Sequence, residues 1–318
     1  MISDHLQKNV KISKYPFLQK LFYPKDCTRD SGNVRINLKF EGRERFYKIH
    51  LPQGYDNNQP AALILNFHGG AGSPDDQQIQ SKMDEVSDQQ GFIVVYPAGT
   101  GTGGDHNLFF NAGNVHGYAK AHNVNDIGFV EYIIQDLEKK FTIDPTRIFC
   151  TGFSNGAKFC YLLAARLSHV IAAIGAVSGT TAFPKDEYKP QRCVSIIHFH
   201  GTADPVNPYE GGSGLPLIEK ISGTTVYNTP VKEMISHFVE VNECRKGSCR
   251  IIQKGNAQCE SYGPGKEGTE VILWTLIGGG HTWPGGESTL PKFMAGGVSN
   301  DICASELIWE FFKAHPMH

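Results

Sequence analysis

The chain has 318 residues, of which 40% are hydrophobic and 19% are charged, and its formal net charge is −2 at pH 7. A chain of this length can bury a sizeable core. The balanced charge provides no basic surface for nucleic acid or anionic membrane, and no run of about 18 apolar residues could span a bilayer. We therefore expect a globular protein without a nucleic-acid partner and without a membrane span.

Residues 1–30 are polar and lack the apolar core of a signal peptide, so we expect an irregular N-terminal extension followed by one domain over residues 31–318. Residues 34–38 and 46–51 alternate between apolar and polar side chains, a pattern typical of half-buried antiparallel strands. The later apolar runs are continuous, which indicates strands buried on both faces of a sheet. They cover residues 61–67, 91–96, 148–150, 171–177, 194–199 and 271–276.

Helical patterns lie between these runs. Asp126 can cap a helix whose apolar side chains fall on one face as far as Phe141. Further helices are expected over residues 157–167, 234–241 and 305–312. Because strands and helices alternate, we predict an α/β fold with a mostly parallel, mixed sheet and helices on both faces. The long connections over residues 99–125 and 209–229 are expected to wall a pocket, with surface decoration as the alternative.

The segment Gly152-Phe153-Ser154-Asn155-Gly156 lies where an expected strand meets an expected helix. A serine at such a junction sits on a sharp, strained turn that exposes its hydroxyl above the sheet edge. Glycine is needed on both sides because a Cβ there would crowd the neighbouring strand and helix. Ser154 is therefore the candidate nucleophile, and the alternative is a glycine-rich turn without chemistry.

A serine hydroxyl needs a base that removes its proton and an acid that orients the base. In α/β-hydrolase folds these residues follow the serine in the order Asp or Glu, then His. Asp204 comes just after one buried run, and His281 follows another in Gly278-Gly279-Gly280-His281. Both lie beyond the carboxyl end of an expected strand, where ligands bind in open α/β sheets. The sequence therefore predicts the triad Ser154, Asp204 and His281.

The turn His68-Gly69-Gly70 follows the apolar run over residues 61–67. In this fold such a turn supplies one backbone N–H to the oxyanion hole, and the residue after the nucleophile supplies the other. We therefore expect oxyanion donors from Asn155 and from either Gly69 or Gly70. His68 is expected to orient this turn as a substrate-binding residue and not to act as a base.

Two other patterns could hold a metal or a disulfide. His198 and His200 alternate along one run and could form a metal pair, but histidines in an apolar strand are more typical of a hydrogen-bonded core. Cys244, Cys249 and Cys259 allow a surface disulfide, whereas zinc would need a fourth ligand that this stretch lacks. We expect no metal and no cofactor. Buried free thiols are expected at Cys150, Cys160 and Cys193.

The motifs form an ordered set from about residue 33 to the C-terminus. They include the His68-Gly69-Gly70 turn, the Ser154-Asn155-Gly156 elbow, His200-Gly201-Thr202-Ala203-Asp204 and Gly280-His281-Thr282-Trp283-Pro284-Gly285. With these motifs the chain resembles the family that joins poly(3-hydroxybutyrate) depolymerase-like esterases with feruloyl and acetylxylan esterases. The resemblance implies an α/β-hydrolase catalytic domain over residues 31–318. It also implies that Trp283 lines the substrate pocket, with a structural role as the alternative.

The resemblance further implies a serine carboxylic-ester hydrolase that forms an acyl-enzyme. The expected substrate is a feruloyl- or acetyl-type ester of plant polysaccharide, as a small molecule or a polymer side chain. Poly(3-hydroxybutyrate) or its oligomers are the alternative, and a non-catalytic binding scaffold is an alternative of another class. The resemblance favours a secreted or periplasmic protein, although the chain shows no signal peptide. It makes no prediction of the oligomeric state.

One departure from the family pattern affects a substrate-binding loop. Many relatives carry two adjacent cysteines after an Asn-Ala-Gly step, whereas here Asn111-Ala112-Gly113 is followed by Asn114-Val115. A disulfide beside the pocket is therefore not expected at this step.

Overall fold

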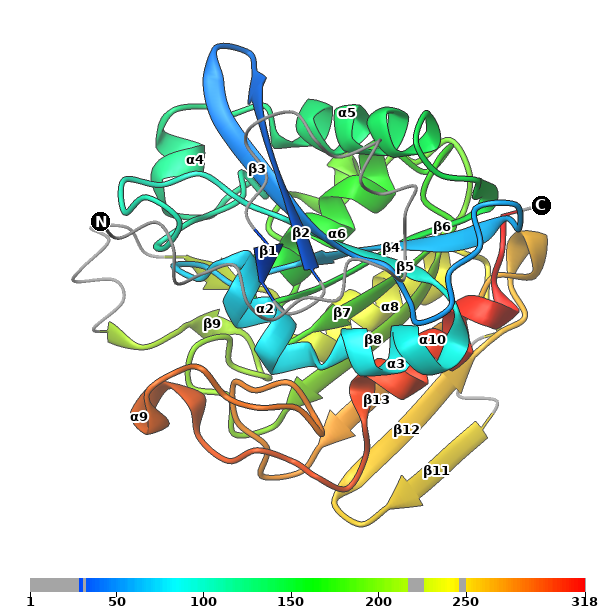
Figure 1. The fold of residues 1–318 in the computed structure, drawn as a ribbon. Coiled ribbons are helices and arrows are strands. Elements are labelled where there is room, and N and C mark those ends of the chain that lie inside the picture. The colour runs from blue at the N-terminus through cyan, green and yellow to red at the C-terminus, as the bar shows by residue number, and fades with distance from the viewer. Residues whose placement is uncertain (1–28, 31–32, 217–225, 246–249, 318) are drawn as a thin grey trace.

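The computed structural model describes residues 29–30, 33–216, 226–245 and 250–317 (Figure 1). Most of the expected N-terminal extension, residues 1–28, lies outside this description. The strands are β1 (Arg29–Asp30), β2 (Asn33–Phe40), β3 (Arg43–His50), β4 (Ala61–Phe67), β5 (Ile93–Pro97), β6 (Ile143–Phe153), β7 (Ala173–Val177), β8 (Ser195–Gly201), β9 (Gly212–Ser213), β10 (Tyr227–Asn228), β11 (Arg250–Lys254), β12 (Ala257–Tyr262) and β13 (Val271–Leu276). The helices are α2 (Pro74–Ser81), α3 (Met83–Gln90), α4 (Tyr118–Ala121), α5 (Asp126–Glu138), α6 (Asn155–Arg166), α8 (Val231–Val241), α9 (Lys292–Ala295) and α10 (Ala304–Ala314).

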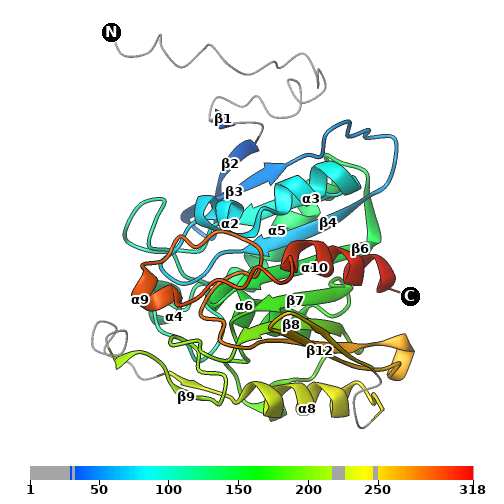
Figure 2. The same ribbon diagram turned by 90° about the horizontal axis from the view of Figure 1, so that it is seen from below.

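One large sheet organises the molecule, with strand order β1-β2-β3-β5-β4-β6-β7-β8-β13-β12-β11. The six strands from β5 to β13 in this order are parallel, and their continuous apolar sequences are buried as predicted. Strands β2 and β3 add an antiparallel pair at one edge, which confirms the prediction of a mixed sheet. Figure 2 shows this pair at one end of the sheet and β12 with α8 at the other.

The second antiparallel pair, β11 and β12, differs from the prediction. The sequence of this pair is mostly polar and contains no long apolar run. This is typical of an edge, and β11 is the last strand of the sheet, paired only with β12. Side chains such as Ile251 remain exposed there. An edge hairpin of this kind has no long apolar run, so the sequence pattern predicts no strand over residues 250–262.

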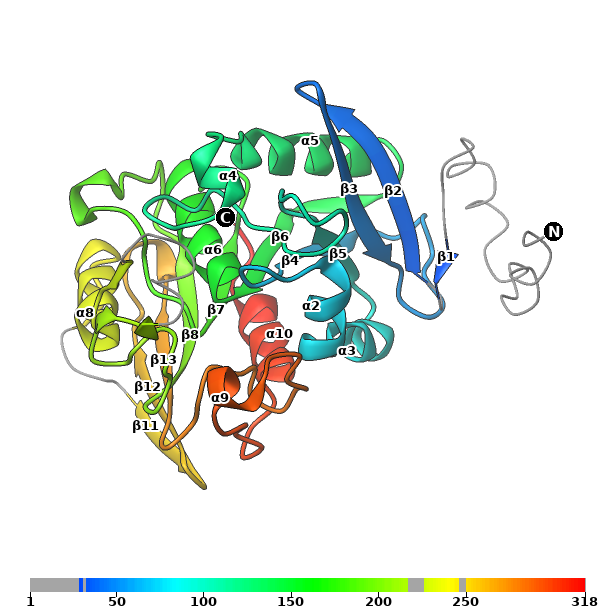
Figure 3. The same cartoon turned by 90° about the vertical axis from the view of Figure 1, so that its left-hand side faces the viewer.

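Helices cover both faces of the sheet (Figures 1 and 3). Helices α5, α6 and α8 bury Phe129, Phe159 and Phe238 in the core on one face. Helices α3 and α10 bury Met83 and Phe312 in the core on the other face. In the described part of the chain, no helix combines the length and the apolar character that crossing a bilayer requires.

Helices α2 and α3 are absent from the sequence prediction because they are mostly polar. Local signals start and stop them instead. Ser73 caps α2 by accepting a hydrogen bond from the backbone N–H of Asp76 at 3.2 Å, and Pro74 occupies the first helical position. Lys82 adopts a left-handed conformation and separates the two helices.

The start of α5 corrects one prediction. Asn125, not Asp126, is the N-cap, and its side chain accepts from the backbone N–H of Gly128 at 2.9 Å. Asp126 is instead buried inside the first turn, where it pairs with Arg45 of β3 at 2.7 Å. Its second oxygen accepts from the backbone N–H of Asn111 at 2.8 Å. The carboxylate therefore ties the connection over residues 99–125 to both β3 and α5.

Replacing Asp126 with asparagine is expected to lower the free energy of unfolding by about 3–5 kcal/mol, because Arg45 would keep a buried charge without its counterion. Urea denaturation measures this difference. Glu310→Gln is the control, since it breaks an exposed pair with Lys313 and is expected to cost less than about 1 kcal/mol. Equal losses in the two variants would contradict this account of the buried pair.

Candidate active site

Ser154 lies in a strained turn between β6 and α6. Its backbone has φ 53° and ψ −111°, which is a costly conformation for a residue with a Cβ. The backbone N–H of Ser154 donates to the carbonyl of Val177 at 2.9 Å, so β7 holds the turn in place. A Cβ on Gly156 would lie 2.3 Å from the carbonyl oxygen of Phe67. The strand–turn–helix geometry is the one that the sequence predicts, and it leaves Ser154 half-buried while its neighbours are buried.

His281 and Asp204 come together from two different strand ends. His281 Nδ1 lies 2.7 Å from Asp204 Oδ2, and both side chains are almost completely buried. The two loops that carry them are in direct contact, because the backbone N–H of Ala203 donates to the carbonyl of Gly279 at 2.9 Å. Gly201 permits this approach, since a Cβ there would lie 2.2 Å from the same carbonyl oxygen.

The nucleophile candidate lies at the same edge of the sheet. The rings of Phe153 and His281 are 4.6 Å apart between centroids, so the residue before Ser154 packs against the imidazole. A hydrogen bond between the Ser154 hydroxyl and His281 is part of the predicted triad, and catalytic hydrogen bonds of this kind often tighten only when substrate binds.

The environment of Asp204 keeps its carboxyl ionised. Oδ1 accepts from the backbone N–H groups of Val206 and Asn207, both at 2.8 Å, while Oδ2 faces His281. Burial alone would raise the pKa of Asp204, but His281, His200 and the Asn207 N–H together bring that pKa below its usual value. An ionised carboxylate only accepts hydrogen bonds, so His281 donates from Nδ1, which leaves Nε2 as the ring nitrogen that can accept a proton.

His68 fixes the turn that precedes α2. The ring is completely buried, its Nδ1–H donates to the carbonyl of Gly69 at 2.7 Å, and its Nε2 accepts from the backbone N–H of Gly99 at 3.0 Å. Burial lowers the pKa of His68 to about 4. Since both ring nitrogens are engaged within the protein, His68 is placed to hold the turn and not to contact a substrate.

The glycines of this turn lie next to the elbow. A Cβ on Gly69 would lie 3.5 Å from the Cβ of Ser154, and a Cβ on Gly70 would lie 3.6 Å from the Cβ of Asn155. The N–H of Asn155 belongs to the first turn of α6 and has no partner within the helix. The backbone groups of Asn155, Gly69 and Gly70 are therefore grouped around the Ser154 side chain.

The side chain of Asn155 has a role that the sequence does not indicate. Its Oδ1 accepts from the backbone N–H of Phe110 at 2.8 Å, and its Nδ2 donates to the carbonyl of the same residue at 3.2 Å. These bonds attach the connection over residues 99–125 to the elbow. The ring of Phe109 also packs against Gly70. This connection therefore borders the elbow, and its role as the wall of a pocket stays a prediction.

The other long connection is described only in part, because residues 217–225 lie outside the description. At its end, Asn228 of β10 accepts from the Nζ of Lys158 at 2.6 Å and donates to the carbonyl of Gly212 at 3.2 Å. Lys158 is buried in α6, one turn after the nucleophile, and burial lowers its pKa to about 8. The sequence pattern gives no sign of this buried ammonium, since lysine on a helix is normally exposed.

Trp283 lies in the core and does not border the site described above. Its side chain is 1% exposed, and its Nε1 donates to the hydroxyl of Ser305 in α10 at 3.0 Å. The hydroxyl of Ser305 in turn donates to the carbonyl of Ser81 at the end of α2. This packing favours the structural alternative over the pocket-lining one.

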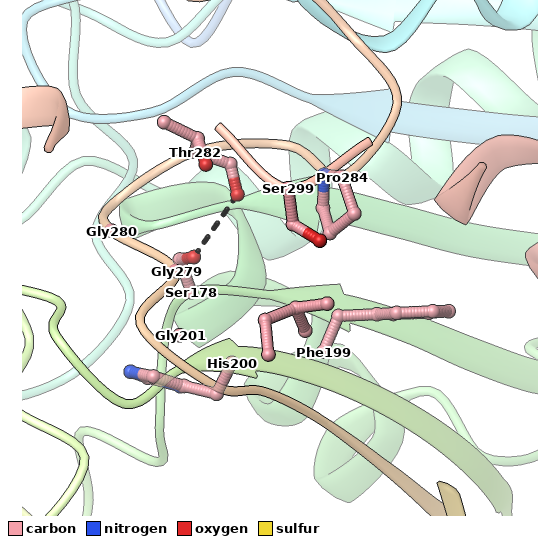
Figure 4. Close-up of a pocket in the computed structure, with 10 residues that line it drawn as sticks. Ser178, Phe199, His200, Gly201, Gly279, Gly280, Thr282, Pro284 and Ser299 are labelled. Atoms are coloured by element: carbon pink, nitrogen blue, oxygen red, sulfur yellow. Dashed lines mark hydrogen bonds between the residues drawn. The ribbon is translucent and has the colours of Figure 1, made fainter. Parts of the chain in front are cut away.

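Figure 4 shows how the loop that carries His281 rests on β7 and β8. Ser178 and His200, at the ends of these strands, face Gly280 and Thr282 across a space too tight to hold a water molecule. The hydroxyl of Ser178 donates to the carbonyl of Thr282 at 3.4 Å. The space is therefore a packed contact that supports the loop, not a binding pocket.

The paired histidines and the cysteines that the sequence analysis considered lie in the core, as far as the structure describes them. His198 and His200 are buried and hydrogen-bonded to each other at 3.1 Å, as predicted for core histidines. The buried free thiols are confirmed at Cys150, Cys160 and Cys193. The expected disulfide involves a cluster of which Cys249 lies outside the described residues, so that pairing stays a prediction.

Because His68 is buried and neutral, it makes the folding stability depend on pH. Below about pH 6.5 the unfolded chain binds a proton at this residue, whereas the folded chain does so only near pH 4. The contribution of His68 is thus complete above about pH 6.5 and falls by about 3 kcal/mol as the pH drops to about 4. Urea denaturation from pH 7.5 to 4.5 should show a shallower pH dependence in His68→Gln than in the unchanged protein. The same slope in both proteins would contradict this assignment.

Comparison with known proteins identifies the family and the fold of the chain. The model of the family "Esterase PHB depolymerase" matches residues 46–207, which is half of the chain. The putative esterase NocK of Nocardia uniformis subsp. tsuyamanensis is 26% identical over 298 residues, which cover 89% of this chain and 83% of NocK. The probable feruloyl esterase C of Aspergillus niger is 27% identical over 298 residues, which cover 91% of this chain and 89% of that protein. Some other fungal relatives are longer, and the chain spans less than half of their length.

Among solved structures, the acetyl xylan esterase from Aspergillus awamori superposes with a TM-score of 0.57 at 16% sequence identity. The superposition covers 78% of this chain and 94% of that one. At this identity the similarity establishes the fold, which is the α/β-hydrolase fold predicted from the sequence. The family match and the esterase relatives establish the class of reaction. The chain therefore belongs to the PHB depolymerase esterase family and is a carboxylic-ester hydrolase.

Proposed function

We propose that the protein cleaves its ester through Ser154, His281 and Asp204, with an acyl-enzyme as intermediate. The observation that carries this proposal is the buried 2.7 Å hydrogen bond between His281 Nδ1 and Asp204 Oδ2. This bond fixes the tautomer in which Nε2 can take a proton, beside a serine on a strained elbow. An orienting carboxylate, a base and a strained serine at one sheet edge are the parts that acyl transfer needs.

In the first half of the reaction, Ser154 Oγ attacks the carbonyl carbon of the ester and its proton passes to His281 Nε2. The tetrahedral intermediate collapses as the bond to the alcohol oxygen breaks, and His281 returns the proton to that oxygen. In the second half, water attacks the acyl-enzyme, again with His281 as base, and releases the acid and Ser154. Asp204 stabilises the imidazolium ion in both halves.

The negative charge that develops on the carbonyl oxygen requires donors near Ser154. The backbone N–H of Asn155 is one, and the N–H of Gly69 or Gly70 is the other. Supporting this assignment, a Cβ added to Gly69 would lie within van der Waals distance of the Ser154 side chain, and one added to Gly70 within that distance of the Asn155 side chain, while His68 holds their turn. Loss of one such donor typically lowers kcat by about 10²–10³.

The proposed substrates are feruloyl- or acetyl-type esters of plant polysaccharide. Support comes from relatives whose names specify feruloyl and acetylxylan esters. The half-buried ring of Phe109, which packs on the Gly70 turn, offers an aromatic wall next to the reacting bond. The description of the matching family supports 3-hydroxybutyrate oligomers as a second candidate.

A comparison of kcat/KM on methyl ferulate, 4-nitrophenyl acetate and short 3-hydroxybutyrate oligomers tests the substrate class. The expected result is a higher value for the ferulate or the acetate, with Ser154→Ala as the background. A clear preference for the oligomers would replace the plant ester as the substrate. Full activity of Ser154→Ala on any of the three would refute the proposed triad itself.

A further inference from the structure

Behind Asp204 lies a chain of buried polar side chains that the proposed mechanism does not use. The hydroxyl of Tyr161 in α6 is 2.9 Å from His198 Nδ1, and His198 Nε2 is 3.1 Å from His200 Nδ1. His200 Nε2 is 2.7 Å from the backbone carbonyl oxygen of Asn207. Each of the three residues is at most 1% exposed, so the hydrogen bonds between them are buried.

The direction of every hydrogen bond in this chain follows from its last member. A carbonyl oxygen only accepts, so His200 must carry its proton on Nε2 and accept at Nδ1. His198 then donates from Nε2 to His200 Nδ1, and its own Nδ1 accepts a hydrogen bond from the Tyr161 hydroxyl. Burial lowers the pKa of both histidines, that of His198 well below its usual value. Each ring is therefore neutral and fixed in one tautomer.

Asn207 links this chain to the triad. Its carbonyl accepts from His200, while its backbone N–H donates to Asp204 Oδ1 at 2.8 Å. Its side-chain amide donates to the carbonyl of Ser178 at 2.6 Å. His200 Nε2 also lies 3.5 Å from Asp204 Oδ2, which is the oxygen bonded to His281. The backbone of Asn207, whose N–H orients one carboxylate oxygen, is thus held at its carbonyl by the same ring that borders the other oxygen.

We propose that His200 is a positioning residue of the triad, which binds the carbonyl of Asn207 and so holds the backbone N–H of that residue, and with it Asp204, in line with His281. The proposal rests on the triad proposed above. Without the His200 donor, the Asn207 carbonyl would be left buried and unpaired, and the loop over residues 204–207 would shift to reach another partner. A shift of about 1 Å in a catalytic group can lower kcat by about 10²-fold.

The charged and titratable neighbours of His200 explain why a neutral ring suits this place. Asp204 and His281 lie on one side, His198 on another, and the buried ammonium of Lys158 is close enough to lower the pKa of His200. A protonated His200 would compete with the His281 imidazolium ion for Asp204. The Tyr161–His198 pair prevents this, because it supplies a donor to Nδ1 and leaves no acceptor for a second proton.

Substitutions that differ only in the donor test the proposal. Glutamine places an amide near the position of Nε2 and can still donate to the Asn207 carbonyl, whereas asparagine and phenylalanine cannot reach it. We expect His200→Phe and His200→Asn to lower kcat by about 10–100-fold with KM within about twofold, and His200→Gln to recover most of this loss. His315→Gln is the matched control, since it removes another buried histidine whose Nδ1 donates to a carbonyl in α10.

A spectroscopic readout separates positioning from general stability. The proton between His281 Nδ1 and Asp204 should give a far-downfield ¹H NMR resonance that persists in His200→Gln and His315→Gln and weakens or moves upfield in His200→Phe. An unchanged resonance and a kcat loss no larger than that of His315→Gln would overturn the proposal. If His200→Phe does not fold, the comparison of His200→Asn with His200→Gln decides in the same way. Fluorophosphonate labelling that survives Ser154→Ala would instead refute the triad, so the two failures are distinguishable.

Discussion

Asp204→Asn is expected to lower kcat on 4-nitrophenyl acetate by about 10⁴-fold while leaving the fold intact. Oδ1 of Asp204 accepts two backbone N–H groups at 2.8 Å, so the amide oxygen of asparagine must occupy that position. Its NH₂ group then faces His281 Nδ1, which becomes an acceptor. The ring must carry its proton on Nε2 and can no longer take one from Ser154.

Steady-state rates together with urea denaturation test this prediction. Asp301→Asn is the matched control, because Asp301 accepts a backbone N–H from Asn256 at 3.0 Å in a hairpin turn. That variant should retain its activity within about twofold. A loss of less than about tenfold in Asp204→Asn would mean that the tautomer of His281 does not depend on Asp204.

Gly156→Ala is expected to have a large effect on stability. Alanine normally stabilises a helix by about 1 kcal/mol relative to glycine, so helix propensity alone predicts a gain. In α6, however, the added Cβ would lie 2.3 Å from the carbonyl oxygen of Phe67 and 2.7 Å from that of His68. Both atoms belong to backbone that cannot rotate away. We therefore expect the free energy of unfolding to fall by about 3 kcal/mol or more.

Urea denaturation of Gly156→Ala and Gly297→Ala provides the comparison. A Cβ on Gly297 meets its nearest atom at 3.5 Å, an ordinary contact, so its loss should stay below about 1 kcal/mol. A Gly156→Ala variant that is as stable as the unchanged protein would show that α6 and β4 can separate easily. In that case the close approach of the His68 turn to the elbow would not be fixed by packing.

The sequence predicts those parts of the fold that a short stretch of residues specifies by itself, through an apolar run or a required glycine. The parallel strands are buried on both faces and therefore carry continuous apolar runs, as residues 61–67 and 271–276 do. The elbow is predictable because only glycine fits on both sides of Ser154. Asp204 and His281 follow from their order and from their places after strand ends. Helices α2 and α3 could not be predicted because most of their residues are polar and the sequence shows little of an apolar face.

The supporting contacts of the site could not be predicted, because they depend on distant parts of the chain. Nothing near Asn155 in the sequence indicates that its amide binds the backbone of Phe110, which lies 45 residues away. Asp126 has the features of an N-cap, and only its contact with Arg45 of β3 explains its burial. Only the family resemblance places Trp283 in the pocket, and the sequence does not indicate that its indole donates to Ser305 of α10.

The central claim is that Ser154 is the nucleophile of this esterase. A fluorophosphonate that forms a stable adduct with activated serines, followed by peptide mass spectrometry, tests it most directly. The account predicts one adduct per chain on the peptide that contains Ser154, with no adduct in Ser154→Ala and strongly slowed labelling in His281→Ala. An adduct on a different residue, or ester hydrolysis by a protein that forms no adduct at all, would contradict it.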